Sequence, residues 1–189
     1  MKKLLLLILP ILILCTTSCT FANNKNGELI LKDKKVLIAY FSWSGNTKYI
    51  AEKIHNQTGG DMFQIETATP YPINYKETAY GIAKKQHDEN VKPKLKNNGD
   101  VSSYDVIFVG TPVWWYEMAP AVKTFLIENN FEGKIIVPFI TNGGGGQYTV
   151  AKDMAQLAKG SKVLTPFVTI NRGDSNVQNE INSWLKELK

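Results

Sequence analysis

The sequence predicts an α/β protein built on a parallel β-sheet with helices on both faces. Five apolar segments rich in strand-forming residues lie between residues 36 and 170, and three of them are nearly continuous apolar runs, as in strands covered on both faces. Each is followed by a segment whose apolar side chains recur at helical spacing. Because a parallel strand is reached through a crossover helix, five strand–helix pairs indicate a doubly covered parallel sheet.

The first two strand–helix pairs occupy the first half of the domain. The run VLIAYF, residues 36–41, predicts a buried strand, and the amphipathic segment 46–57 predicts a helix that ends at the glycine pair 59–60. A short strand is expected over 62–66. Apolar residues at helical spacing between Pro72 and Pro93 predict the second helix.

The other three pairs complete the sheet. Strands are expected over 106–110, 135–140 and 163–170. One helix between them is expected to begin at Pro120, since proline is tolerated in a first turn, and the next is expected over 147–159. Asp174 or Ser175 is expected to cap the last helix.

An export signal is predicted over residues 1–18, ahead of one domain at 33–189. Lys2 and Lys3 precede an eleven-residue apolar run, which is too short to span a hydrocarbon layer about 30 Å thick. No other long apolar run follows, which excludes a protein with several membrane spans. The composition, 43% hydrophobic, excludes a disordered chain.

The residues after this run resemble the lipobox of bacterial lipoproteins, in which a cysteine is lipidated and becomes the new N-terminus. Cys19 is the better candidate, because Ser18 before it is small whereas Leu14 before Cys15 is bulky. Residues 19–32 are then a lipidated end and tether, and the resemblance implies an exported protein of the cell envelope, anchored to the membrane by lipid.

Both cysteines lie in this N-terminal segment, so the domain can contain no disulfide, thiolate metal site or cysteine nucleophile. His55 and His87 are expected on the surface, and no metal site is predicted. Removal of residues 1–18 lowers the net charge from +5 to +3. A mildly basic chain, without aromatic residues among its lysine-rich stretches, indicates no nucleic-acid partner.

Three loops that follow predicted strands carry unusual residues, and ligands of such sheets bind at the carboxyl ends of the strands. The first loop places hydroxyl groups and a glycine at a helix N-terminus, which favours an anion. Its spacing matches neither a Walker loop nor a hydrolase elbow. Its candidate residues are Ser42, Trp43, Ser44, Gly45, Asn46 and Thr47.

The second loop contains three adjacent aromatic residues, which cannot all face the core; a ring left in a pocket can stack on a flat conjugated ligand. Its candidates are Pro112, Val113, Trp114, Trp115 and Tyr116. The third loop has four glycines, which let the backbone approach a ligand closely. Its candidates are Gly143, Gly144 and Tyr148.

The first loop resembles the phosphate loop of flavodoxins, whose pattern of two hydroxyls, a glycine and a threonine is met by Ser42, Ser44, Gly45 and Thr47. The segments around residues 70–75, 110–126 and 133–141 also resemble flavodoxin-like proteins. The resemblance covers residues 34–189. It implies a three-layer sandwich with strand order 2-1-3-4-5 and non-covalent FMN, with its phosphate in the first loop and its ring beside the aromatic residues.

The sequence therefore predicts an FMN-binding electron carrier at the outer face of the cytoplasmic membrane, with no catalytic side chain. Its redox partner, a protein or a quinone, stays open, as does the aromatic residue that stacks on the flavin. One alternative is an FMN-dependent reductase that passes electrons from NAD(P)H to a quinone or a flavin. A second is a binding lipoprotein that kept the fold without the cofactor.

Overall fold

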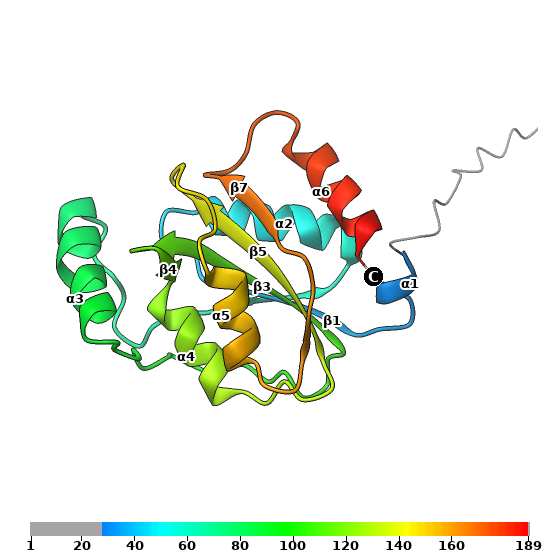
Figure 1. Ribbon diagram of the computed structural model, residues 1–189, viewed down its shortest axis with the longest axis horizontal. Helices are drawn as coiled ribbons and strands as arrows, with labels where there is room; N and C mark the ends of the chain where they lie inside the picture. The colour runs from blue at the N-terminus through cyan, green and yellow to red at the C-terminus, as the bar shows by residue number, and fades with distance from the viewer. Residues whose placement is uncertain (1–27, 189) are drawn as a thin grey trace, which may run out of the picture.

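The computed structural model describes residues 28–188, which form three layers around a central sheet (Figure 1). Helices α2 and α6 cover one face of the sheet, and α4 and α5 cover the other. The strands are β1 (Val36–Tyr40), β2 (Asp61–Gln64), β3 (Val106–Trp114), β4 (Glu117–Met118), β5 (Ile135–Asn142), β6 (Lys162–Val163) and β7 (Phe167–Ile170). The helices are α1 (Glu28–Leu31), α2 (Asn46–Thr58), the π-helix η1 (Glu77–Ile82), α3 (Ala83–Asp88), α4 (Pro120–Glu128), α5 (Val150–Leu157) and α6 (Val177–Glu187).

The sheet has the order β2-β1-β3-β5-β6, and β7 also pairs with β5; all of these pairs are parallel. In the numbering of the predicted strands this is 2-1-3-4-5, so the flavodoxin-like sandwich is confirmed. Successive residues of β1 pack on opposite faces: Ile38 belongs to the core under α2 and α6, and Ala39 to the core under α4 and α5. Burial on both faces explains why this strand is uniformly apolar.

The number of strands differs from the prediction in two places. The expected fifth strand, 163–170, is divided into β6 and β7. Pro166 lies in the break and has no N–H for a ladder, while the carbonyl of Thr165 accepts a hydrogen bond of 3.0 Å from the indole of Trp184. The short strand β4 was not predicted; it folds back on the end of β3 as an antiparallel hairpin.

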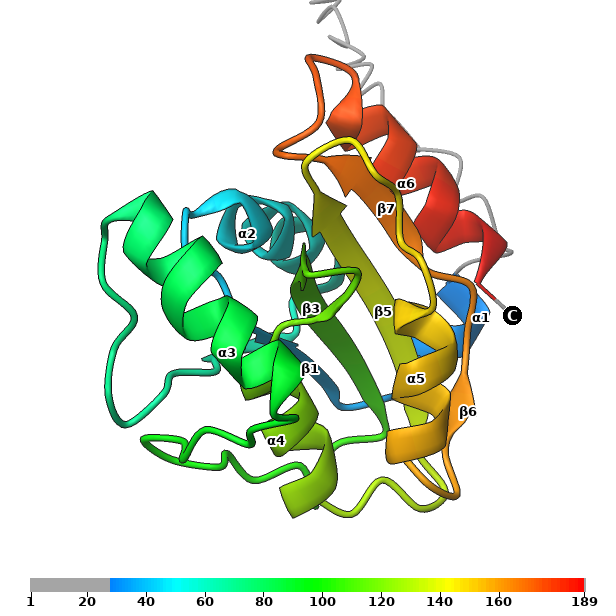
Figure 2. The same ribbon diagram turned by 60° about the vertical axis from the view of Figure 1, so that its left-hand side comes forward.

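Helix boundaries also differ from the prediction. Helix α5 starts at Val150 instead of residue 147, and the last helix is preceded by Asn176 at the N-cap position. Asp174, one of the two expected caps, instead accepts the backbone N–H of Asn176 at 2.7 Å. The helix expected between Pro72 and Pro93 is η1 followed by α3, and the two stand beside the carboxyl end of the sheet next to the β3–β4 hairpin (Figure 2).

The predicted signal segment and Cys19 lie outside the described residues. The end of the predicted tether forms α1, and its residues Ile30 and Leu31 pack against the core on the α2 and α6 face. Between residues 28 and 188, no helix has both the length and the apolar character that a membrane crossing requires.

Candidate functional site

A cavity of about 580 Å³ opens at the carboxyl ends of the central strands. This volume is in the range of sites that take small organic ligands. All three predicted loops contribute to its walls, together with η1 and the residue after β7. The lining residues are Trp43, Ser44, Asn46, Tyr75, Thr78, Ala79, Tyr80, Ala83, Pro112, Val113, Trp114, Trp115, Tyr116, Thr141, Asn142, Gly143, Gly145, Tyr148 and Asn171.

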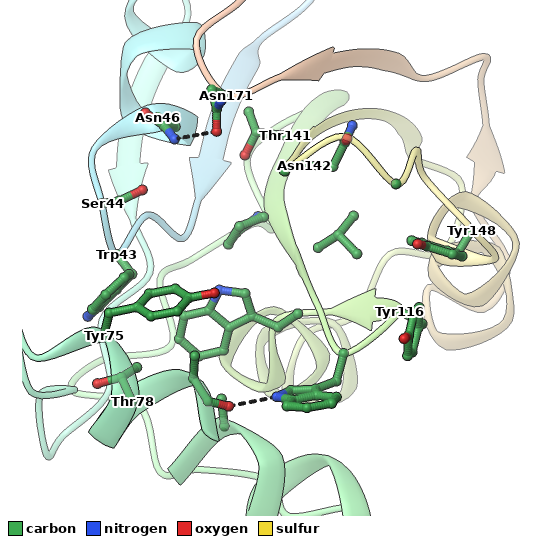
Figure 3. A pocket seen from close by; sticks show the side chains of 18 of the residues that line it. Trp43, Ser44, Asn46, Tyr75, Thr78, Tyr116, Thr141, Asn142, Tyr148 and Asn171 are labelled. Atoms are coloured by element: carbon green, nitrogen blue, oxygen red, sulfur yellow. Dashed lines mark hydrogen bonds between the residues drawn. The ribbon is translucent and has the colours of Figure 1, made fainter. Parts of the chain in front are cut away.

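The structure brings ten of the predicted site residues together around this cavity. Figure 3 shows Trp43 and Tyr75 on one side of it, Tyr116 and Tyr148 on the opposite side, and Asn46 and Asn171 at one end. Four predicted residues do not line the cavity: Ser42, Gly45, Thr47 and Gly144. Ser42, Gly45 and Gly144 lie in the loops that form its walls, and Thr47 is the second residue of α2.

The end of the cavity next to α2 is suited to an anion. Gly45 occupies the N-cap position of α2 with φ +86°, so no side chain caps the helix, and the first turn contains no acidic residue. The Ser42 hydroxyl oxygen is buried and has no hydrogen-bond partner within residues 28–188. A buried hydroxyl without a partner is costly, and a phosphate at the free helix N-terminus would satisfy it.

Thr47 stabilises this end from within. Its hydroxyl oxygen lies 2.9 Å from the hydroxyl oxygen of Thr141 at the end of β5, and both residues are buried. The hydrogen bond therefore joins the first predicted loop to the third. Thr47 does not line the cavity itself but supports Thr141, which does.

The tryptophan side chains of the cavity are held in fixed orientations. The indole N–H of Trp43 donates to the carbonyl of Pro72 at 2.9 Å, and that of Trp115 donates to the carbonyl of Ala79 at 2.7 Å. Trp114 is packed edge-on against Tyr71, with ring centroids 5.0 Å apart. Burial raises the pKa of the Tyr71 hydroxyl to about 12, against the opposing effect of its hydrogen bond to Gln86, so this supporting ring stays neutral.

The wall formed by the 72–83 segment was missed by the sequence analysis. Tyr75, Thr78, Ala79, Tyr80 and Ala83 line the cavity. Helical spacing predicted a helix here and said nothing about a ligand. The signal that was overlooked is the pair of tyrosines, which are 60% and 62% exposed and continue the row of rings from Trp43 to Trp115.

The β3–β4 hairpin is strained at its tip. Val113 pairs with Met118 and Trp114 with Glu117, which leaves a two-residue turn. Its residues, Trp115 and Tyr116, have φ angles of +48° and +69°, in the left-handed region that such turns require. Asn-Gly is the usual choice there, and large side chains cost about 1–2 kcal/mol each. Strain of this kind concentrates at binding sites.

The glycine loop is organised by Asn142, which was not predicted as a site residue. Its side-chain oxygen accepts the N–H groups of Gly144 at 2.8 Å and Gly146 at 3.2 Å, and its amide donates to the carbonyl of Thr169 at 3.0 Å. The N–H of Gly144, expected to face a ligand, is therefore directed at Asn142. Gly143 and Gly145 line the cavity, and Tyr148 meets Tyr116 edge-on at 5.1 Å.

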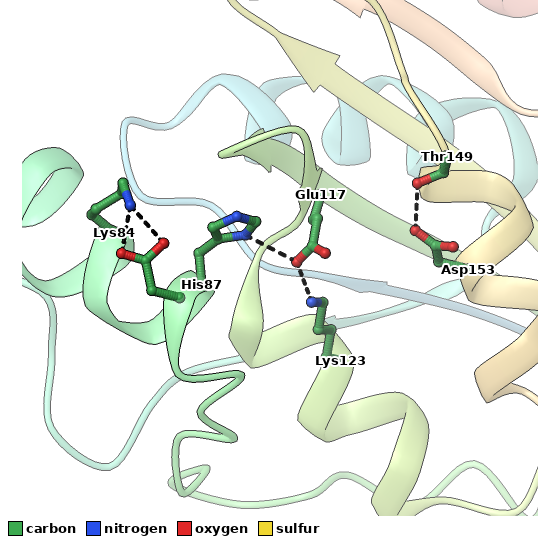
Figure 4. A network of polar contacts seen from close by, with 7 residues as sticks. Lys84, His87, Glu117, Lys123, Thr149 and Asp153 are labelled. Atoms are coloured by element: carbon green, nitrogen blue, oxygen red, sulfur yellow. Dashed lines mark hydrogen bonds and ion pairs between the residues drawn. The ribbon is translucent and has the colours of Figure 1, made fainter.

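A small polar network fixes the hairpin from outside (Figure 4). The carboxylate of Glu117 accepts hydrogen bonds from Lys123 of α4 and, at 3.3 Å, lies next to the ring nitrogen Nδ1 of His87 of α3. Burial alone would raise the pKa of Glu117, but the hydrogen bonds and charges of Lys123 and His87 outweigh it and hold the pKa below its usual value. Both partners stand outside the cavity wall, so the network supports the hairpin.

The fold and the site together define a doubly wound α/β protein with a ligand cavity at the carboxyl ends of its strands. The family model that describes flavodoxins matches residues 35–188. The chain therefore belongs to the flavodoxin family.

Solved structures agree with this assignment. A flavoprotein candidate from Bacteroides eggerthii is 30% identical, with a TM-score of 0.67 over 81% of this chain and 96% of its own. A flavoprotein from Lactobacillus acidophilus, solved in complex with FMN, is 28% identical, with a TM-score of 0.60 over 77% of this chain and 97% of its own. A flavodoxin from an archaeon, 21% identical over 81% of this chain and 94% of its own, has a TM-score of 0.54 and shares the fold.

Proposed function

We propose that this protein is an FMN-binding electron carrier anchored at the outer face of the cytoplasmic membrane. The observation that supports it most is the pairing of two features in one cavity. One end has a free helix N-terminus, with the buried, unpartnered hydroxyl of Ser42 in the loop that leads to it, and much of the rest is walled by aromatic rings. A phosphate ester joined to a flat conjugated ring fits this division, and the similar Lactobacillus protein was solved with FMN.

Each part of the cavity has a role toward FMN. Ser42, Ser44 and the first amides of α2 would hold the phosphate, while the indole and phenol rings would enclose the flavin. Bound FMN supplies the redox chemistry, and the chain controls binding and solvent access. The pinned N–H groups of Trp43 and Trp115 keep their rings in place before the ligand arrives, which lowers the entropy cost of binding.

The electron-carrier role is favoured by the lack of acidic and basic side chains among the residues that line the described cavity. Among the lining residues of the described cavity none is an aspartate, glutamate, histidine, lysine or arginine. Electron transfer through a flavin requires no side chain that gains or loses a proton, whereas general acid–base catalysis does. The cavity therefore suits a carrier better than an enzyme that needs a carboxylate or an imidazole as its acid or base, and an FMN-dependent reductase is distinguished from a carrier by how fast NADH or NADPH reduces the bound flavin.

Titration of the apo protein with FMN tests the assignment. We expect one FMN per chain, quenching of both flavin and tryptophan fluorescence, and visible absorption bands in the purified complex. The carrier role further predicts slow reduction of the bound flavin by NADH or NADPH in stopped-flow measurements. Rapid reduction by either nucleotide would support the reductase alternative, and a protein that ignores added FMN would contradict the assignment altogether.

The membrane location rests on the residues before the domain. A charged start, an apolar run and the small residues before Cys19 form the pattern on which the lipid anchor is proposed. The Cys19→Ser variant should lose incorporation of labelled fatty acid and leave the membrane fraction. Cys15→Ser, which removes the other cysteine and keeps Ser18 and Cys19, is the matched control. Membrane retention of Cys19→Ser without label would contradict a lipid anchor at this residue.

A further inference from the structure

Arg172 is positioned beside the N-terminus of α2, although it belongs to the loop between β7 and α6. Its Nε donates a hydrogen bond of 3.1 Å to the side-chain oxygen of Asn46, the first residue of α2. Its guanidinium carbon lies 5.7 Å from the centre of the Tyr49 ring. A β-carbon added to Gly45 would stand 3.6 Å from its Nη2 atom. The first two contacts hold the exposed Arg172 side chain against α2, and the third distance places its guanidinium next to the N-cap glycine.

The charge of Arg172 is not compensated by the chain around it. No carboxylate of residues 28–188 lies within ion-pair distance of Arg172, and the first turn of α2 contains no acidic residue. The helix N-terminus carries a partial positive charge of its own, so the exposed guanidinium beside it adds to the positive potential that an anion would meet there. Within the same part of the chain, Nε makes the only hydrogen bond of the guanidinium, which leaves its Nη donors free.

The guanidinium is held by neutral groups in a way that leaves it available to a ligand. Asn46 has a second bond of 3.4 Å, from its side-chain nitrogen to the side-chain oxygen of Asn171, which lines the cavity. Tyr49 supports the flat face of the guanidinium. The buried hydroxyl of Ser42, four positions before Asn46 in the loop that leads to α2, is also without a partner within residues 28–188.

We propose that Arg172 determines the specificity of this site for a phosphate monoester, by pairing its Nη groups with the phosphate that the α2 N-terminus holds. The proposal rests on the FMN assignment and adds to it a charged residue outside the loop pattern of neutral donors. A planar guanidinium can donate two parallel hydrogen bonds to a phosphate, which a neutral hydroxyl or amide cannot do. The protein then distinguishes FMN from riboflavin by charge as well as by the length of the ligand.

The test compares FMN with riboflavin, using fluorescence titrations of the full-length apo protein. Hydrogen bonds between charged groups contribute enough to predict a loss of roughly 10- to 100-fold in FMN affinity for Arg172→Gln. Riboflavin affinity should change by less than about twofold, because it has no phosphate. The salt dependence of FMN binding should become weaker in the variant, and Arg172→Lys should recover only part of the loss.

Lys53→Gln is the matched control. Lys53 belongs to α2, and its ammonium nitrogen lies 4.8 Å from the centre of the Tyr49 ring that Arg172 also approaches. Its hydrogen bond, however, is to Gln178 of α6. The Lys53→Gln substitution removes the same unit of charge farther from the N-terminus of α2. The affinities for FMN and for riboflavin should therefore both stay within about twofold of the unmodified protein.

Three outcomes would overturn the proposal. Unchanged FMN affinity in Arg172→Gln would show that the guanidinium does not contact the phosphate. An equal loss of FMN and riboflavin affinity would show that Arg172 only shapes the loop. Failure of the unmodified protein to bind either flavin would overturn the FMN assignment itself, and the proposal with it.

Discussion

The Ser44→Asp variant is expected to bind FMN about 100-fold more weakly while remaining folded and at least as stable. Ser44 is exposed, lines the cavity and directly precedes the N-cap residue Gly45. A carboxylate there repels the phosphate; at about 4 Å and an effective dielectric constant near 20, two unit charges interact by about 4 kcal/mol. Because Ser44 is exposed, solvent and salt screen part of this repulsion, and a 100-fold loss corresponds to about 2.8 kcal/mol. The same carboxylate interacts favourably with the N-terminus of α2, by about 0.3–1 kcal/mol.

Ser44→Asp is informative because it should lower the affinity for FMN while leaving the free energy of unfolding unchanged or higher. FMN titration gives the affinity, and urea unfolding of the apo protein gives the free energy of unfolding. Ser44→Asn, which is similar in size and carries no charge, is the control and should lose far less affinity. If Ser44→Asn loses as much affinity as Ser44→Asp, the effect is steric and the phosphate does not lie at this end of the cavity.

The Asn142→Ala variant is expected to have the second large effect, on both stability and binding. The Asn142 side chain is only 7% exposed and makes hydrogen bonds to Gly144, Gly146 and Thr169. Its removal leaves backbone groups without partners, at about 1–3 kcal/mol for a buried one. We expect the apo protein to lose about 3 kcal/mol of unfolding free energy, and the loosened glycine loop to bind FMN at least about tenfold more weakly.

Asn129→Ala provides the comparison. Asn129 follows α4, does not line the cavity, and donates its amide to the carbonyls of Asn98 and Phe125, both at 3.0 Å. This variant should lose about 1 kcal/mol of unfolding free energy without a change in FMN affinity. Urea unfolding and FMN titration measure both quantities. Normal FMN affinity in Asn142→Ala would show that the glycine loop takes no part in binding.

Most of the sheet was predictable because burial on two faces leaves a local trace. All five residues of β1, and the first four of β3, are apolar and buried, because both faces of these strands meet a helix layer. The division of the fifth predicted strand left one local sign, Pro166, which cannot donate to a ladder. The hydrogen bond from Trp184, nineteen residues away, to Thr165 at the break is visible only in the structure.

The candidate site was predictable only where it follows directly from strand ends. The three segments predicted to follow strands meet in space because parallel strands end at the same edge, so ten of their fourteen candidate residues line the cavity, although β3 extends to Trp114 and contains the first three of its candidates. Asn142 was missed because its role is to organise neighbouring backbone, for which an asparagine in a glycine-rich loop gives no distinct pattern.

The sequence by itself determined the layers of the fold, the loops that form the ligand cavity and the type of ligand those loops suit. Periodicity and short-range spacing carry this information, because each depends on neighbours within one strand or turn. Only the tertiary structure decided that the 72–83 segment forms a further wall and that Arg172 stands beside Asn46, 126 positions earlier in the chain. Such proximity follows from how β7 and α6 are placed against α2, and residue spacing along one chain does not record it.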